Sequence, residues 1–337
     1  MTSRVTIADI ARAAGVSTST VSRALNNHSG IPEITRQQIQ RIAADLNYRV
    51  DVRARNFRLQ RSGTIATLFP FQQSSRRPLS DPFYLEIVGA ITDELDQHGY
   101  DSLIARVQVE RDDWCNHYVL DKRVDGILLI DRAVQDNGIR ILQSLGAHFV
   151  VWGATIQGQN YVSVGCDSTA GACDAVKHLA EMGRKQIAFI GGFQHMVETD
   201  ARRRGYVQGL TNAGLPIDEN LMMFTDFTPD AAGKAVIDLL ANVPDLDGVF
   251  ACSDFMAVGV METLRQHGKI VPDDVAVVGY DDIPLAAYYS TRLTTIQQPI
   301  HEGGRQMVQK LLAMIDGQNV ESLLMPHQLV VRESSGK

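Results

Sequence analysis

The chain has 337 residues, 45% of them hydrophobic and 21% charged, and a formal net charge of −7. This length exceeds one ordinary domain, and the composition is that of a globular protein. No run of about 18 apolar residues is present, so no membrane-spanning helix is expected, and the N-terminal segment predicts no export signal. We therefore expect a cytoplasmic protein whose four cysteines stay reduced, since none stands in a C-x-x-C pair.

The charge is divided unevenly along the chain. Residues 1–62 hold ten arginines, no lysine and four acids, hence +6, and the whole-chain charge of −7 leaves −13 for the remainder. A small basic segment on a larger acidic one indicates a polyanionic partner for the basic segment alone.

Three short amphipathic helices are predicted in the basic segment. The first begins after Thr6, has Asp9 in its first turn and ends at Gly15. The second begins after Ser17, and the third opens around Pro32. Their apolar stripes are Ile7, Ile10, Ala11 and Ala14, then Val21, Ala24 and Leu25, then Ile39, Ile42, Ala43 and Leu46. The tight turn between the first two predicts a helix-turn-helix, whose second helix enters the major groove of DNA.

The second predicted helix carries small polar side chains on its outward face. Thr18, Ser19, Ser22 and Arg23 point away from the apolar stripe. Short hydroxyl side chains let a backbone approach the groove, and Arg23 can donate two parallel hydrogen bonds to guanine O6 and N7. A solvated helix face is the alternative. The adjoining turn, the third helix and the basic surplus favour DNA.

The segments VTIADIARAAGVSTSTVSRALNN and TRQQIQRIAADLNYR resemble the DNA-binding head of the LacI/GalR family of bacterial transcription regulators. The resemblance extends through the whole chain and implies that the positions of Thr18, Ser19 and Arg23 read the operator. The sequence departs from the family pattern at the start of the third helix, where Ile31-Pro32 stands in place of the usual Val-Ser. Proline suits the first turn of a helix.

The segment DVRARNFRLQRSGT, residues 51–64, is basic and ends in a Ser-Gly linker. By composition it could form an exposed linker or a marginal helix, because so short a segment cannot hold a helix alone. The family resemblance implies a hinge helix that orders on the operator, with Phe57 at the position of the family's wedging leucine and Val50 replacing a usual proline. Apolar wedges including Phe unstack base steps in the minor groove. The expected DNA-binding residues are Thr6, Ser17, Thr18, Ser19, Thr20, Ser22, Arg23, Asn26, Ala54, Phe57 and Arg58.

After Thr64 the pattern changes to alternating strands and helices. Apolar runs predict strands at 64–69, 126–130, 148–152, 186–192, 248–253 and 275–281, with helices at 83–98, 168–182, 200–213, 229–241 and 255–267. Such alternation predicts α/β parallel sheets covered by helices. The resemblance implies two lobes like those of periplasmic sugar-binding proteins, joined by crossings near residues 163, 293 and 322. The expected domains are 1–49 (head), 50–62 (hinge helix and linker), 63–163 with 294–322 (N-terminal lobe), and 164–293 with 323–337 (C-terminal lobe).

Candidate effector-binding residues stand near the carboxyl ends of the predicted strands, where open α/β sheets bind ligands. Trp152 could stack on a sugar ring or fill the core, and Glu198 could accept ligand hydrogen bonds or pair with Arg202. Ser253 stands where many family members have asparagine, and several of the other positions match ones that line the family's cleft. The full set is Asp81, Phe83, Leu85, Trp152, Glu198, Arg202, Phe227, Ser253 and Asp281.

An α/β enzyme is the main alternative of another class. No G-x-G-x-x-G, P-loop or strand-linked G-x-S-x-G motif is present, and no histidines have H-E-x-x-H spacing. Asp281-Asp282 could hold a metal ion, but no nearby histidine or third acid supports it. We expect no catalytic residue, metal or cofactor. A periplasmic binding protein shares the predicted body but needs an export signal where this chain has a DNA-binding head.

The sequence thus predicts a repressor-type, nucleoid-associated regulator of transcription. A helix-turn-helix reads one half-site, so a palindromic operator requires a homodimer. No leucine heptad follows Val331, so the tetramerising tail of some family members is not expected. A small effector between the lobes is expected to control operator affinity allosterically. A sugar is favoured and a purine is the rival, while induction and corepression both stay open.

Overall fold

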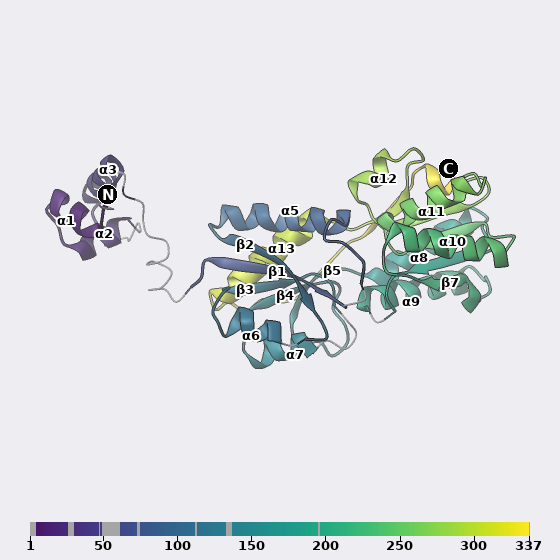
Figure 1. The fold of residues 1–337 in the computed structure, drawn as a ribbon, viewed down its shortest axis with the longest axis horizontal. Coiled ribbons are helices and arrows are strands. Elements are labelled where there is room, and N and C mark those ends of the chain that lie inside the picture. The colour runs from purple at the N-terminus through teal and green to yellow at the C-terminus, as the bar shows by residue number, and fades with distance from the viewer. Residues whose placement is uncertain are drawn as a thin grey trace. The chain divides into compact units, whose positions relative to one another are not determined.

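The computed structural model describes residues 5–25, 30–46, 48, 61–72, 75–111, 113–132, 137–194 and 196–336. The chain divides into two compact units, Met1–Ser62 and Gly63–Lys337, called below the head and the body. Figure 1 shows both units and labels the helices and strands for which there is room. None of the helices in the described ranges is both long enough and apolar enough to span a membrane.

The head contains the three predicted helices, α1 (Ile7–Ala14), α2 (Thr18–Leu25) and α3 (Glu33–Asp45). The backbone N–H and the hydroxyl of Thr6 donate to Asp9 Oδ2 over 2.9 and 2.7 Å, which holds the first turn of α1. Gly15 ends α1 in the left-handed region at φ 65°, which a residue without Cβ adopts readily. The Ser17 hydroxyl accepts from the Thr20 N–H over 3.1 Å and so caps α2. Local capping chemistry therefore sets these helix boundaries.

A small apolar core joins the three head helices. Its buried residues are Ile10, Ala11, Val21, Ala24, Ile31, Ile39 and Ala43, with Leu25 and Ile42 packed against them. These residues confirm most of the predicted stripes. Leu46 differs, because it follows the last turn of α3 and is 37% exposed.

The body contains two six-stranded sheets with strand orders β11-β5-β4-β3-β1-β2 and β12-β10-β9-β8-β6-β7. All neighbouring strands are parallel except β10 and β12. The first sheet comprises β1 (Thr64–Phe71), β2 (Asp101–Gln108), β3 (Gly126–Leu129), β4 (Phe149–Trp152), β5 (Val162–Cys166) and β11 (Leu323–Met325). The second comprises β6 (Ile187–Gly191), β7 (Met222–Phe224), β8 (Gly248–Ala251), β9 (Ala276–Asp281), β10 (Thr294–Gln297) and β12 (Gln328–Val330). The α/β prediction is confirmed.

Helices cover the sheets of both lobes. In the first lobe α5 (Pro82–Gln97) and α13 (Ile300–Ile315) cover one face, and α6 (Asp113–Val119) and α7 (Asn137–Ser144) cover the other (Figure 1). In the second lobe α8 (Ser168–Glu181) packs on α9 (Val197–Asn212), and α10 (Pro229–Asn242) packs on α11 (Asp254–Gln266). Helix α12 (Pro284–Tyr288) and the 3-10 turns Glu219–Leu221 and Glu333–Ser335 complete the body. The four cysteines are free thiols.

The chain passes between the two sheets three times, after Cys166, after Gln297 and after Met325. The sequence predicted these crossings near residues 163, 293 and 322, within four residues of the positions where the chain changes sheet. β5 and β11 pair with each other in the first sheet, and β10 pairs with β9 in the second. Such pairing joins segments far apart in the chain, so apolar runs alone could not place these strands.

Candidate functional site

The outward face of α2 presents the side chains predicted to meet DNA. Thr18, Ser19 and Arg23 are exposed, while Thr20 and Ser22 are half-buried. The Val21 and Ala24 side chains between them are fully buried in the head core. The helix therefore presents hydroxyls and a guanidinium from a surface fixed by the packing beneath it.

Two of the predicted DNA-binding residues also serve the fold of the head. The Thr6 hydroxyl donates to Asp9, and the Ser17 hydroxyl lies 2.7 Å from Ser19 Oγ and 2.9 Å from Thr20 Oγ1. Asn26, Ala54, Phe57 and Arg58 lie outside the described residues. The hinge prediction therefore stays a prediction.

Arg77, which the sequence did not single out, lies where the first lobe meets the second. Its Nε donates to Asp81 Oδ2 over 2.6 Å and its Nη1 donates to Asp131 Oδ2 over 3.2 Å. The guanidinium carbon lies 4.1 Å from the ring centre of Tyr84 and 4.5 Å from that of Phe227 in the second lobe. Arg77 thus links two carboxylates of its own lobe to an aromatic ring of the other lobe.

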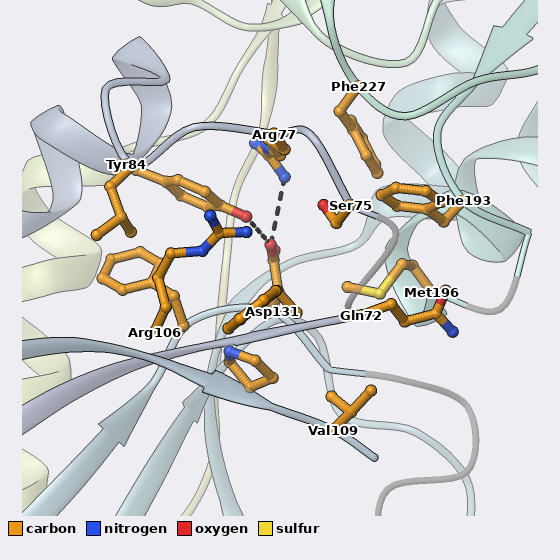
Figure 2. Close-up of a pocket in the computed structure, with 14 residues that line it drawn as sticks. Gln72, Ser75, Arg77, Tyr84, Arg106, Val109, Asp131, Phe193, Met196 and Phe227 are labelled. Carbon is orange, nitrogen blue, oxygen red and sulfur yellow. Dashed lines mark hydrogen bonds and ion pairs between the residues drawn. The ribbon is translucent and has the colours of Figure 1, made fainter. Parts of the chain in front are cut away.

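A pocket between the lobes surrounds this arginine. Figure 2 shows Phe193, Met196 and Phe227 of the second lobe facing Tyr84 and Arg77 of the first. The free cavity is only about 30 Å³, room for about one water molecule, because side chains occupy its centre. A sugar-sized ligand therefore requires Arg77 or the lobes to move.

Asp131 anchors the floor of this pocket just beyond the end of β3. It accepts a hydrogen bond from the Tyr84 hydroxyl as well as the bond from Arg77 (Figure 2). Burial raises the pKa of Tyr84 well above its usual value, so its phenol stays neutral and donates. Asp131 and Tyr84 together hold Arg77 in a defined position.

The second lobe contributes Arg202 of α9 and Asp281 at the end of β9, both buried. Arg202 Nη2 lies 3.5 Å from Asp281 Oδ1, and its guanidinium carbon lies 3.8 Å from the ring centre of Tyr280. Arg202 Nη1 donates to the Cys252 carbonyl, and Gln298 Nε2 donates to Asp281 over 2.8 Å. Burial raises the pKa of Asp281 to about 7 against the opposing effect of Arg202. Two predicted residues are therefore brought together as a buried charge pair.

Glu198 pairs with an arginine of the other lobe rather than with Arg202. Arg132 Nε donates to Glu198 Oε1 over 3.1 Å, and the Val197 N–H donates to the Arg132 carbonyl over 3.2 Å. Arg132 is 1% exposed and also donates to Gln159 and to the Ala154 carbonyl within its own lobe. The contact therefore ties α9 to the first lobe.

A second cavity of about 240 Å³ lies beside this contact. Arg132, Glu198, Arg204 and the first turn of α8 line it. Asp131 and Met196 line the first cavity, and their chain neighbours Arg132 and Val197 line the second. These two cavities therefore lie on opposite sides of the contact between residues 131–132 and 196–198.

Among the other predicted effector residues, Asp81 and Phe227 lie at this site. Asp81 caps α5 by accepting from the Phe83 N–H over 3.0 Å and holds Arg77, and Phe227 lines the first cavity. The structure places three predicted residues elsewhere. Trp152 and Phe83 are packed in the core of the first lobe with ring centres 5.9 Å apart, and Leu85 is 56% exposed on α5.

Ser253 caps α11 by accepting from the Met256 N–H over 3.3 Å. Its hydroxyl therefore serves as the N-cap of the helix, a position that favours short polar side chains. Within the described part of the chain, no group of three His, Cys, Asp or Glu side chains could hold a metal ion.

Four site residues were missed from the sequence: Arg77, Tyr84, Asp131 and Arg132. Asp131-Arg132 follows the predicted strand 126–130 directly, so the strand-end rule could have found both. Arg77 stands in an irregular polar loop, where no spacing indicates that its side chain turns inward.

Two family models match the chain. One describes bacterial regulatory proteins of the lacI family and matches residues 6–51, and the other describes a periplasmic binding protein-like domain and matches residues 176–335. The transcriptional regulator CelR of Thermobifida fusca is 33% identical, covering 98% of each chain. The transcriptional repressor CytR of Escherichia coli K12 is 33% identical over 98% of this chain and 96% of its own.

Solved structures agree with these matches. A CelR–cellobiose complex is 32% identical with a TM-score of 0.74, covering 98% of this chain and 100% of its own. The lac repressor dimer bound to operator and an anti-inducer is 26% identical with a TM-score of 0.85, covering 99% of this chain and 100% of its own. The relatives are DNA-binding regulators rather than enzymes. The chain therefore belongs to the LacI family of bacterial transcription regulators.

Proposed function

We propose that this regulator is a dimeric repressor whose operator affinity is set by a small polar effector, a sugar, bound between the lobes. One observation carries the proposal. Polar and aromatic groups of both lobes converge, since the Arg77 guanidinium of the first lies 4.5 Å from the Phe227 ring of the second and Arg132 Nε lies 3.1 Å from Glu198 Oε1. Carboxylates and guanidiniums offer directional hydrogen bonds to hydroxyls, and Phe227 offers an apolar face to the CH groups of a ring.

Known relatives support a sugar. CelR has been solved with cellobiose, and the lac repressor has been solved with ONPG. A LacI-family regulator of Enterococcus faecium, 26% identical with a TM-score of 0.71, has been solved with ribose; it covers 81% of this chain and 98% of its own. A purine is the rival effector, because Phe193 and Phe227 could stack on a base as well as on a sugar.

For the head, we propose that Thr18, Ser19 and Arg23 read bases in the major groove. Thr6, Ser17, Thr20, Ser22 and Asn26 are proposed to support them or contact phosphates, and Ala54, Phe57 and Arg58 to enter the minor groove. Each head of the dimer takes one half of a palindromic operator. The proposed place of action is the cytoplasm, on the nucleoid.

The effector changes operator affinity only if it binds two arrangements of the lobes unequally. The Arg77–Phe227 and Arg132–Glu198 contacts both cross between the lobes. A ligand that displaces either contact, or adds to it, therefore shifts the balance between arrangements.

A thermal-shift screen of sugars, nucleosides and nucleobases tests the effector site. A cleft ligand at a hundred times its dissociation constant should add about 2.7 kcal/mol to the free energy of unfolding. Arg202→Ala and Asp281→Ala should abolish the shift, whereas the control Arg203→Ala, on the more exposed side of α9, should retain it. A shift that survives both substitutions places the site elsewhere, and shifts by nucleobases alone refute the sugar.

A further inference from the structure

The interlobe face of α9 holds two buried polar atoms that have no hydrogen-bond partner among the described residues. One is Glu198 Oε2, which can only accept while ionised, and the other is Arg202 Nε, which can only donate. The two residues stand four positions apart, so their side chains share one face of the helix. Unsatisfied buried groups are costly and call for partners that the chain itself does not supply.

The buried guanidiniums near the lobe interface are already matched by carboxylates. The three buried arginines each have an acidic partner within 3.5 Å: Arg77 with Asp81 and Asp131, Arg132 with Glu198, and Arg202 with Asp281. Three buried carboxylates and the half-buried Glu198 thus face three buried guanidiniums among the described residues.

Further from the centre, the charges are likewise occupied. Arg204 pairs with Asp200, and Asp167 accepts from the backbone at the start of α8. Arg106 at the rim of the first cavity stacks over Phe71 at 3.9 Å. These outer residues therefore do not change the balance between carboxylates and guanidiniums at the centre of the cleft.

This balance decides which ligand charge the cleft accepts. A carboxylate or phosphate on the ligand must compete with a protein carboxylate for a guanidinium, and the displaced carboxylate is left buried and unpaired. A hydroxyl group has no such effect. It both donates and accepts hydrogen bonds, so it can meet these side chains without displacing a carboxylate from its guanidinium.

We infer that the effector is an uncharged polyhydroxylated molecule, a neutral sugar or glycoside, and that sugar acids and sugar phosphates of the same skeleton are rejected. The inference rests on the proposed function and narrows it. The 240 Å³ cavity, which Glu198 helps to line, supplies room for a hydroxyl-bearing ring beside that side chain.

Calorimetric titration of the full-length chain with matched pairs tests the inference. Suitable pairs are cellobiose and cellobionate, galactose and galacturonate, ribose and ribose 5-phosphate, and glucose and glucose 6-phosphate. At least one neutral member should bind, and its charged partner should bind at least about a hundredfold more weakly, as expected when a buried ion pair is broken. A charged member that binds as tightly as its neutral partner, or alone, overturns the inference and leaves an interlobe effector site standing. Binding by no member of any pair overturns the sugar proposal and the inference together.

A variant of Glu198 tests whether this carboxylate causes the discrimination between neutral and charged ligands. Glu198→Gln removes the buried negative charge while keeping the side-chain length, so the neutral ligand should bind more weakly and the neutral-to-charged ratio should fall about tenfold or more. Glu181→Gln, an exposed residue of α8 in the same lobe, is the matched control and should leave the ratio unchanged. An unchanged ratio in a folded Glu198→Gln protein removes Glu198 from the inference, and the wild-type pairs decide the ligand class without any variant.

Discussion

The head and the body place their functional groups in opposite environments. The head exposes Arg23 and the hydroxyls of α2 above a small core, whereas the body buries Arg77, Arg202 and Asp281 among partners. A DNA duplex brings its own dense negative charge, so exposed donors suffice to meet it. A small effector must be surrounded to be recognised, and the charges that surround it must first be balanced within the protein. Substitutions of exposed head residues should therefore weaken DNA binding without lowering the stability of the head. Substitutions of buried charged residues in the body should lower both effector binding and stability.

The largest loss of stability is expected from Asp81→Ala. This change removes the cap of α5 and one carboxylate of buried Arg77, so the free energy of unfolding of the body should fall by about 3–5 kcal/mol. Asp113→Ala is the matched control, because its partner Arg111 is exposed and such pairs contribute at most about 1 kcal/mol. Denaturant titration measures both. A loss for Asp81→Ala no larger than that of the control contradicts the buried-charge account.

The core of the head offers the next largest effect. Ile39→Ala empties a buried site that joins α3 to α1 and α2, which should cost about 2–5 kcal/mol. The head and the body are separate compact units, so operator binding should be lost while the thermal transition of the body is retained. Ile34→Ala, at a position 82% exposed, should change neither. A shifted body transition in Ile39→Ala would show that the two units are coupled.

Arg23→Ala should change recognition without changing the fold. The loss of a bidentate contact should cost about 1–3 kcal/mol on the cognate operator and relax preference at one base pair. Its exposure on α2 predicts an unchanged circular dichroism melt. Arg12→Ala, exposed on α1 and paired with Asp9, is the control and should retain the base preference. Equal weakening on cognate and random duplex by Arg23→Ala argues against base reading.

The last expected effect is a pH dependence of the body. Burial raises the pKa of Asp281 from 3.8 to about 7, against opposing effects of Arg202 and Arg77. Burial also raises the pKa of Asp254. A carboxyl that holds its proton more tightly when folded stabilises the fold less as pH rises, so this contribution is lost between about pH 4 and 7. The melting temperature should fall over that range, and less in Asp281→Asn than in the exposed control Asp245→Asn. An identical fall in both variants contradicts the assignment.

Sequence information located the head better than the body because the head is specified locally. Thr6, Asp9, Gly15 and Ser17 cap or end their own helices, and the apolar stripes lie within single helices. In the body, the buried runs that form β1, β3, β4, β6, β8 and β9 were predicted.

The strands and residues that the sequence did not reveal depend on distant partners. β2 is half-exposed at a sheet edge, and β5 is fixed by pairing with β11. Arg202 and Asp281 were found from their resemblance to family positions. Arg77 and Arg132 were not found, because only the folded lobes show that these arginines turn inward toward carboxylates.

The central claim is that an effector between the lobes controls operator binding. The direct measurement is fluorescence anisotropy of an operator duplex, obtained by selection from random sequence, titrated with the full-length chain with and without the neutral ligand that binds most tightly. We predict that the ligand changes the operator dissociation constant by about 5- to 150-fold, corresponding to a coupling free energy of about 1–3 kcal/mol. Asp281→Ala should still bind the operator but lose the ligand response. An operator affinity that the ligand leaves unchanged, at concentrations that saturate the wild-type cleft, would contradict the claim.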